Sequence, residues 1–278
     1  MKASFEIAMC QMKVVDDKDE NIQRAISMIS AAGDHGALMV VLPEMFNCPY
    51  ENDKFVEYAE ERLTSKTLKA ISRAASENGV YVIAGSIPEN DAGNIYNSSF
   101  IFDDGGNILD VHRKLHLFDI DVADGINFRE SDTITSGDKV TVIETPLIKF
   151  GVAICFDVRF PELFRLMEME GAKLVVVPGA FNMTTGPAHW ETTLRTRAID
   201  NQIYIAAVSP ARNYELSYVA YGHSMLVDPW GDVIETAREA ESIVYATINE
   251  ELVNQVREEL PLLKNRREDI YELIRKNK

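Results

Sequence analysis

Leu38-Met39-Val40-Val41-Leu42 is an unbroken apolar run, and Pro43-Glu44 ends it. Leu174-Val175-Val176-Val177, which precedes Pro178-Gly179, has the same form in the second half of the chain. A half-buried strand alternates apolar and polar residues, and these runs do not alternate. They therefore predict strands that are covered on both faces, as in the interior of an α/β fold.

The segments around these two runs alternate between strand and helix patterns. Helices are predicted at residues 19–32, 64–78 and 189–202, with Gly33 ending the first and Gly79 capping the second. Further strands are predicted at residues 5–12, 81–86, 96–102, 108–111, 204–209, 223–227 and 233–235, with turn residues at 104–107 and 228–232. Residues 250–259 read as a charged amphipathic helix.

The two halves of the chain share this order of segments. Val41-Leu42-Pro43 recurs as Val176-Val177-Pro178, and Tyr81-Val82-Ile83-Ala84 resembles Tyr204-Ile205-Ala206-Ala207. Two sheets that pack face to face, with helices outside, would cover both faces of each strand. We therefore predict an α/β fold of the four-layer αββα type, with two stacked mixed sheets; a single doubly wound sheet is the alternative.

The whole chain, residues 1–278, is expected to form a single domain. Its charged C-terminal extension, from about residue 250 to 278, is expected to pack on that domain or on a partner subunit.

The charge and cysteine content exclude several classes of function. The formal net charge is −16, from 44 acidic and 28 basic residues, which disfavours binding to nucleic acid or to an anionic membrane surface. No apolar run approaches the roughly 20 residues that span a bilayer. The three cysteines do not suggest a disulfide framework, so a cytoplasmic protein is expected.

Common cofactor and metal motifs are absent from the sequence. It contains no phosphate-binding loop of the G-x-x-x-x-G-K-S/T type, no H-E-x-x-H helix and no C-x-x-C pair. The five histidines are scattered. We therefore expect neither a metal nor a cofactor.

Three side chains of complementary chemistry follow predicted strands. Cys155 ends the apolar run 150–154 and precedes a helical segment, a corner whose N–H groups favour a thiolate and a developing oxyanion. Glu44 follows a strand among apolar neighbours, which suits a general base. Lys114 is bracketed by apolar residues after another strand, so its side chain can point inward. Taken singly, each has a plainer explanation as a buried thiol, a loop acid or an exposed lysine.

Together the segments that carry these residues resemble the nitrilase superfamily of carbon–nitrogen hydrolases. The matching segments are Leu42-Pro43-Glu44, His112-Arg113-Lys114-Leu115-His116 and the stretch from Gly151 to Glu162 around Cys155. The resemblance covers nearly the whole chain and implies an αββα sandwich, a Glu–Lys–Cys triad and a homodimer. Residues 178–190, 209–212 and 221–224 resemble the omega-amidase branch, and residues 128–131 place the additional active-site glutamate of the family at Glu130.

The resemblance implies hydrolysis of short keto-dicarboxylate monoamides, such as 2-oxoglutaramate and 2-oxosuccinamate, through a cysteine thioester. Lys114 and the backbone N–H of Phe156 would hold the oxyanion. A small anionic amide entering a chain of net charge −16 needs a local cation, and Arg159 is the candidate, with Thr185 adding a hydroxyl. Phe118 and Tyr221 are candidate pocket walls.

Other functions remain open from the sequence. An amidase acting on deaminated glutathione, a carbamoyl-amine amidase and a nitrilase are alternatives within the same superfamily. A catalytically silent binding subunit is the alternative from a different class, although the intact Glu44, Lys114 and Cys155 argue against it.

Overall fold

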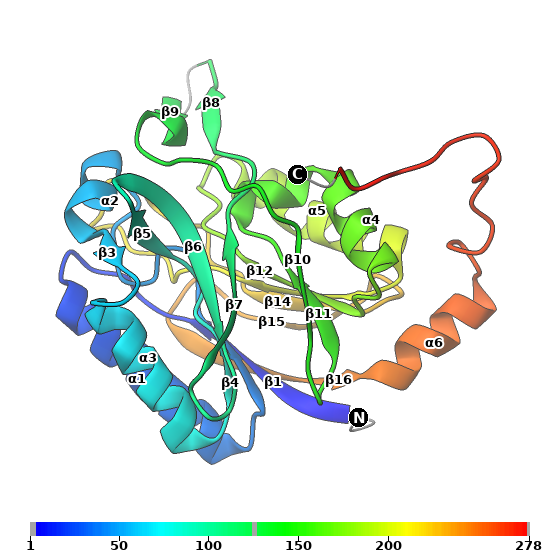
Figure 1. Ribbon diagram of the computed structural model, residues 1–278, viewed down its shortest axis with the longest axis horizontal. Helices are drawn as coiled ribbons and strands as arrows, with labels where there is room; N and C mark the ends of the chain where they lie inside the picture. Colours follow the sequence, from blue (N-terminus) through cyan, green and yellow to red (C-terminus); the bar gives the residue numbers. More distant parts are fainter. Residues whose placement is uncertain (1–3, 124–126, 277–278) are drawn as a thin grey trace.

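The computed structural model describes residues 4–123 and 127–276. Two β-sheets stack face to face, and helices cover the outer face of each (Figure 1). The predicted αββα architecture is therefore confirmed, and the single doubly wound sheet is excluded.

The first sheet is built mainly from the N-terminal half of the chain. Its strands are β1 (Ser4–Gln11), β2 (Met39–Val41), β3 (Glu60–Glu61), β4 (Tyr81–Ile83), β5 (Ile87–Asp91), β6 (Asn94–Phe102), β7 (Ile108–Arg113) and β16 (Ser242–Asn249). They lie in the order β16-β1-β2-β4-β6-β5-β3, and β7 also pairs with β6. The β1–β2 and β2–β4 pairs are parallel, whereas β16 runs antiparallel to β1.

The second sheet comes from the C-terminal half. Its strands, in spatial order, are β10 (Thr141–Glu144), β11 (Lys149–Val152), β12 (Leu174–Pro178), β13 (Tyr204–Val208), β14 (Met225–Val227) and β15 (Val233–Thr236). A separate hairpin of β8 (Asp119–Asp121) and β9 (Asn127–Arg129) projects from the body of the molecule (Figure 1).

Helices flank the two sheets. They are α1 (Lys18–His35), α2 (Asn52–Tyr58), α3 (Lys66–Asn78), α4 (Pro161–Met169), α5 (Gly186–Asn201) and α6 (Glu250–Glu259), with short 3₁₀ turns η1 (Glu130–Asp132) and η2 (Cys155–Arg159). Apolar residues of α1 and α3 pack on the first sheet, and those of α4 and α5 pack on the second. A third apolar layer, which includes Met39, Val41, Val176 and Ala206, fills the space between the sheets.

The internal repeat seen in the sequence corresponds to a repeated topology. In each half, a strand, a helix and a parallel strand are followed by a second helix, a third parallel strand and an antiparallel hairpin. The series β1-α1-β2-α3-β4-β6-β7 therefore matches β11-α4-β12-α5-β13-β14-β15. Glu44 follows β2 of the first sheet and Cys155 follows β11 of the second, so the two sheets contribute one residue each.

The first helix is longer than predicted. Gly33 does not end it: α1 continues to His35, and Gly36 caps it in a left-handed conformation with φ 103°. Gly33 instead lies where α1 approaches α3, since a Cβ there would come 3.0 Å from the Cβ of Asn78. The prediction for Gly79 is confirmed, because this residue caps α3 with φ 62°.

Candidate active site

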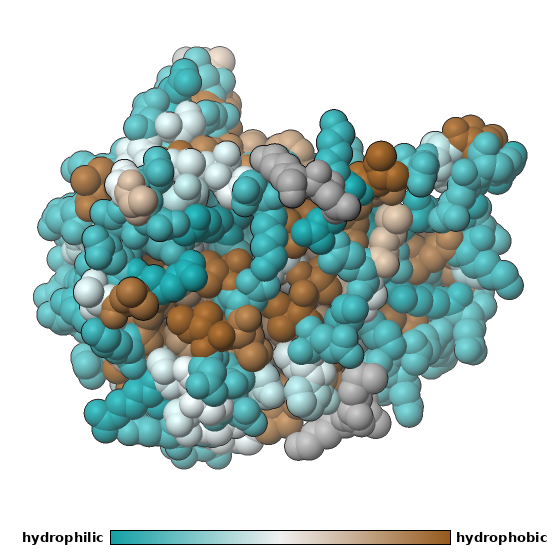
Figure 2. Space-filling view, viewed as in Figure 1, coloured by the Kyte–Doolittle hydropathy of each residue, from teal (hydrophilic) through white to brown (hydrophobic). Residues whose placement is uncertain are grey.

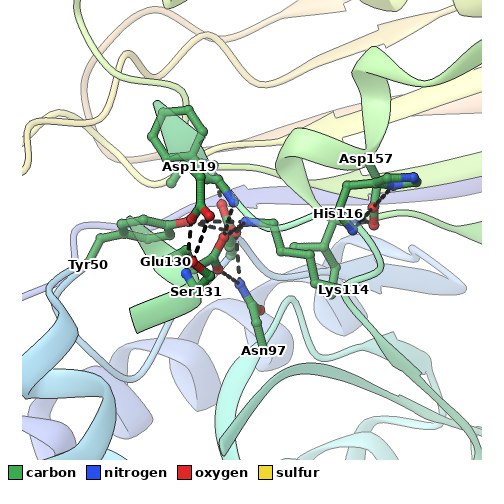
Figure 3. A network of polar contacts seen from close by, with 12 residues as sticks. Tyr50, Asn97, Lys114, His116, Asp119, Glu130, Ser131 and Asp157 are labelled. Carbon is green, nitrogen blue, oxygen red and sulfur yellow. Dashed lines mark hydrogen bonds and ion pairs between the residues drawn. The ribbon is translucent and has the colours of Figure 1, made fainter. Parts of the chain in front are cut away.

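A buried lysine lies between two buried carboxylates where the sheets meet (Figure 3). The Nζ atom of Lys114 is 2.9 Å from Oε1 of Glu44 and 2.8 Å from Oε2 of Glu130. Glu44 follows β2, Lys114 follows β7 and Glu130 begins η1, so three separate segments supply the group. All three side chains are closed off from solvent.

Both carboxylates are held by further hydrogen-bond donors. Glu44 accepts a bond from the backbone N–H of Ala180 at 2.7 Å, and Glu130 accepts one from the backbone N–H of Phe118, also at 2.7 Å. The Nδ2 group of Asn97 donates to Glu44 at 2.9 Å and to Glu130 at 3.1 Å. Such charge-assisted bonds fix the carboxylates in position and keep buried charge satisfied.

The two carboxylates also determine the charge on the lysine. Burial by itself would lower the pKa of Lys114, but the negative charges of Glu130 and Glu44 outweigh burial and raise the pKa above its usual range. The ammonium is therefore permanent at neutral pH. The cluster therefore places one ammonium against two carboxyl groups before any substrate enters.

Cys155 begins η2, and two residues separate it from the end of β11. Its φ of 46° is in the left-handed region, which costs a non-glycine residue on the order of 1–3 kcal/mol. Backbone strain of this kind is commonly retained at functional sites, where the strained conformation orients a functional side chain. As the first residues of a 3₁₀ turn, Cys155 and Phe156 have backbone N–H groups with no partner inside the turn, so the Phe156 N–H is available to a ligand.

The thiol of Cys155 lies close enough to Glu44 and Lys114 for both charges to act on it. Burial raises the pKa of this thiol well above its usual value, the Glu44 carboxylate raises it further, and Lys114 opposes them. The turn favours a thiolate, whereas burial and Glu44 favour the protonated thiol, for which Glu44 is the adjacent proton acceptor.

Aromatic side chains line the space beside the buried cluster. Phe118 is buried and contacts the ring of Phe156, with centroids 5.4 Å apart. Tyr50 and Tyr218 pack together at 4.6 Å, and the Tyr50 hydroxyl is 3.1 Å from Nζ of Lys114. The Tyr218 hydroxyl donates to the carbonyl oxygen of Ala180 at 2.5 Å.

Arg159 ends the 3₁₀ turn that Cys155 begins, and the charges of the two groups act on each other. Within the described residues it forms no ion pair with Asp157 or Glu162, the acidic neighbours that could have neutralised it. Its guanidinium lies over the rings of Phe181 at 4.9 Å and Phe156 at 5.5 Å, and it contacts Nδ1 of His189 at 3.3 Å. Burial lowers its pKa from the usual value, while Cys155 acts in the opposite direction.

The two remaining predicted site residues lie farther from the buried cluster. The hydroxyl of Thr185 donates to Oδ1 of Asn182 at 3.2 Å, at the start of α5. Tyr221 stacks on His223 at 4.1 Å and packs against Gly186. The hydrogen bonds and ring contacts found among described residues connect neither side chain to Glu44, Lys114 or Cys155.

Three residues of this site were not identified from the sequence: Tyr50, Asn97 and Tyr218. Asn97 lies in the predicted strand at residues 96–102, but Ser98 and Ser99 beside it are also polar, so the sequence did not single it out. Tyr50 and Tyr218 offered no signal, since each lies in a segment without a regular pattern.

Within residues 4–123 and 127–276, no group of three or more His, Cys, Asp or Glu side chains is arranged to hold a metal ion. None of the helices described is both long enough and apolar enough to cross a membrane.

Comparison with known proteins extends these observations. A family described as carbon-nitrogen hydrolase matches residues 6–258. The chain is 48% identical to the omega-amidase NIT2 of Xenopus tropicalis, over 99% of each chain, and 45% identical to that of Homo sapiens, over 96% of this chain and 97% of the relative. The crystal structure of Saccharomyces cerevisiae Nit3, a member of branch 10 of the nitrilase superfamily, covers 96% of this chain and 98% of its own, with a TM-score of 0.88 and 40% identity. A buried Glu–Lys pair beside a cysteine on an αββα sandwich, together with these matches, establishes that the chain belongs to the carbon–nitrogen hydrolases of the nitrilase superfamily and is an enzyme of omega-amidase type.

Proposed function

We propose that this enzyme hydrolyses the terminal amide of short keto-dicarboxylate monoamides, such as 2-oxoglutaramate and 2-oxosuccinamate, with Cys155 as the nucleophile. The observation that carries the proposal is the position of Lys114, buried between Glu44 and Glu130 and close to the thiol. This arrangement supplies a proton acceptor and a permanent cation at one thiol, the groups that acyl transfer requires.

In the acylation step, sulfur attacks the amide carbon as the thiol proton passes to Glu44. This proton transfer is needed because the pKa of the thiol is raised, so very little free thiolate exists at neutral pH. The charge that develops on the amide oxygen is received by Lys114 and by the N–H of Phe156. Removing one such donor typically costs roughly 3–4 kcal/mol of transition-state stabilisation.

The intermediate then collapses to a thioester. Glu44 returns its proton to the amide nitrogen, the carbon–nitrogen bond breaks, and ammonia leaves. Water next attacks the thioester carbon while Glu44 accepts one of its protons. The carbon–sulfur bond breaks, the proton returns to sulfur, and the dicarboxylate is released. Glu130 is proposed to hold Lys114 and the water in position in both halves of the cycle.

The proposed specificity rests on charge. The ammonium of Lys114 is already paired with Glu44 and Glu130, so an anionic substrate needs another cation, and Arg159 is free of acidic side chains among the described residues. We assign the substrate carboxylate to the guanidinium of Arg159. Thr185, which directly precedes α5, is proposed to contribute a hydroxyl after turning from Asn182, and Phe118 to form a wall. Tyr221, which stacks on His223 and packs against Gly186, is proposed as a second wall.

A substrate panel tests this proposal. Ammonia release is measured for 2-oxoglutaramate, 2-oxosuccinamate, deaminated glutathione, a carbamoyl amine, an aliphatic nitrile and a neutral short amide. The highest kcat/KM is expected for the keto-dicarboxylate monoamides. A higher value for deaminated glutathione, or for either of the other two classes, would replace the substrate assignment while leaving the thiol chemistry in place. No turnover of any compound would favour a silent binding subunit.

We also propose that the enzyme acts as a homodimer in the cytoplasm. Apolar side chains are exposed along the C-terminal segment, including Ile270, Tyr271 and Ile274. Figure 2 shows further apolar groups gathered over the region where β7 and β10 lie in Figure 1, and β7 exposes Ile108 and Leu109. Light scattering coupled to size exclusion is expected to give the mass of two chains.

Replacing Ile270, Tyr271 and Ile274 by serine is expected to lower that mass toward one chain if the C-terminal segment joins the subunits. Leu63→Ser is the matched control, because Leu63 is even more exposed yet lies on another part of the surface. A single-chain mass for the unmodified enzyme would contradict the dimer.

A further inference from the structure

A second buried carboxylate network lies beside the site and is not part of the chemistry described above. Asp157, two residues after Cys155, is closed off from solvent and accepts hydrogen bonds on both of its oxygens. Oδ1 accepts from the backbone N–H of His116 at 2.9 Å and from Nδ1 of the same residue at 2.7 Å. Oδ2 accepts from the backbone N–H of Ile154 at 2.9 Å and contacts Nε2 of His112 at 3.4 Å.

These contacts reach the segment that carries the catalytic lysine. His112 and His116 flank Lys114 at equal spacing along the chain. Figure 3 shows Lys114 and His116 extending from this segment to different partners: Lys114 to Glu130 and Tyr50, and His116 to Asp157. One stretch of chain is therefore attached to two buried anionic centres.

Both imidazole rings are themselves held in place. Nδ1 of His112 is 3.1 Å from Oγ1 of Thr141, which is also buried. The ring of His116 stacks on Phe160, with centroids 3.6 Å apart and planes 11° apart. Neutral rings satisfy this network when His112 carries its proton on Nε2 and His116 on Nδ1, so each donates to Asp157.

Asp157 also closes the turn in which Cys155 lies. Its carboxylate accepts from the N–H of Ile154, and its own N–H donates to the carbonyl oxygen of Ile154 at 3.0 Å. Cys155 lies between these two residues with the left-handed φ of 46°. Burial alone would raise the pKa of Asp157, but its bonds from His112, His116 and Ile154 lower it, so the group stays ionised.

We propose that Asp157 is a positioning residue, which ties the Cys155 turn to the 112–116 segment and so fixes the thiol relative to the ammonium of Lys114. The inference rests on the proposed role of Cys155 as nucleophile. A displacement of about 1 Å between reacting groups is enough to cost roughly 100-fold in rate, so a single carboxylate can control the chemical step without touching the substrate.

Asp157→Asn tests the role. Each oxygen of Asp157 faces two N–H groups, so the NH₂ group of an asparagine would face hydrogen-bond donors in either orientation of the amide. Alkylation of Cys155 by iodoacetamide is followed by peptide mass, which separates it from Cys10 and Cys48. A positioning role lowers the rate constant of this reaction by at least about tenfold, and lowers kcat by a similar factor with KM nearly unchanged. If Asp157 has a purely structural role, the substitution lowers only the fraction of molecules that are folded. The folded molecules then react with the normal rate constant.

Glu89→Gln is the matched control. Glu89 is also buried, and it accepts hydrogen bonds from Arg62, Arg113 and Ser98. Its loss is expected to lower the melting temperature without changing the Cys155 rate constant per folded molecule. An unchanged rate constant in Asp157→Asn, or an equal fall in Glu89→Gln, would overturn the proposal.

The histidines provide a second test if Asp157→Asn does not fold. His112→Gln and His116→Asn keep a side-chain donor near the positions of Nε2 and Nδ1, whereas His112→Leu and His116→Ala remove it. The variants that keep a donor are expected to retain most of the rate constant for Cys155 alkylation, and the variants that remove it are expected to lose most of it. Equal behaviour of the two pairs would contradict the role of Asp157.

A failure of the positioning role and a failure of the proposed function give different results. Alkylation needs no substrate, so it reports the placement of the thiol even if the enzyme prefers another amide. If Cys155→Ala retained turnover, the nucleophile assignment would fail, whatever the alkylation rates of the other variants.

Discussion

At the scale of single residues, Arg159 is proposed to determine which amides are accepted. It lies beside Phe156 and Phe181 and has no acidic partner among the described residues. Arg159→Ala is expected to raise KM for 2-oxoglutaramate about tenfold or more, since a hydrogen bond between charged groups is worth roughly 1.5–3 kcal/mol. KM for a neutral short amide is expected to stay within about twofold. Steady-state kinetics with both substrates test this prediction. Equal changes in KM for the two substrates would show that Arg159 does not bind the substrate carboxylate.

Asn97 acts on the two carboxylates together. Asn97→Leu keeps most of the side-chain volume but removes the donor shared by Glu44 and Glu130, and leaves both less well satisfied. Losing such a donor costs roughly 1–3 kcal/mol, so we expect kcat to fall about tenfold or more. Ser99→Ala on the same strand is the control, because the buried hydroxyl of Ser99 has no hydrogen-bond partner among the described residues. If both variants keep full kcat, the Asn97 bonds do not matter to the reaction.

Sequence patterns predicted which residue types meet at the site but not how they are held. Glu44, Lys114 and Cys155 could be found because each follows an apolar strand within a recognisable segment. Asn97, Tyr50 and Tyr218 could not, because their importance arises from distances that only the folded sheets create. The turn around Cys155 favours a thiolate, but burial and Glu44, which only the folded structure brings to bear, raise the pKa of the thiol.

At the scale of elements, the loop after β4 is the support for Glu44. Gly85 has φ 45°, and a Cβ there would lie 2.0 Å from the carbonyl oxygen of Pro43, the residue before Glu44. Gly85→Ala is therefore expected to destabilise the fold by about 3 kcal/mol or more and to reduce activity in any folded remainder. Denaturant unfolding and kcat are the measurements.

Gly79→Ala is the matched comparison. Gly79 also has a positive φ, 62°, but nothing lies within 4 Å of its absent Cβ. Only the backbone cost should appear, about 1 kcal/mol, with activity unchanged. Similar losses in the two variants would mean that the contact with Pro43 is unimportant.

The elements themselves were predicted where apolar runs are long and were missed where they are short or exposed. The helix at residues 250–259 and the Gly79 cap match the structure, as does the β6–β7 hairpin. The strand β16 was missed, although it lies beside β1 along its full length, because it is partly exposed and its pairing joins the two ends of the chain. Gly33 was misread because its role is to allow a close helix crossing, which no local pattern reveals.

At the scale of the whole molecule, buried carboxylates make stability depend on pH. Burial raises the pKa of Asp157 and Glu89, but hydrogen bonds from His112 to the first and from Arg113 to the second outweigh it, so both pKa values are lowered in the folded state. Groups of this kind bind protons more readily when unfolded, so their contribution is complete above the unfolded values of about 4 and is lost as pH falls below them. The free energy of unfolding in urea is expected to fall progressively as pH drops below about 4. Asp157→Asn and Glu89→Gln should each flatten that fall, and an unchanged slope in both would contradict the assignment.

The central claim is that Cys155 carries the acyl group. The most direct measurement is to mix the enzyme with 2-oxoglutaramate, quench in acid within the first turnovers and map adducts by peptide mass. We predict a thioester on the peptide containing Cys155, absent from Cys155→Ala and retained in Cys10→Ser and Cys48→Ser. An acyl group on another residue, or continued ammonia release by Cys155→Ala, would contradict the account.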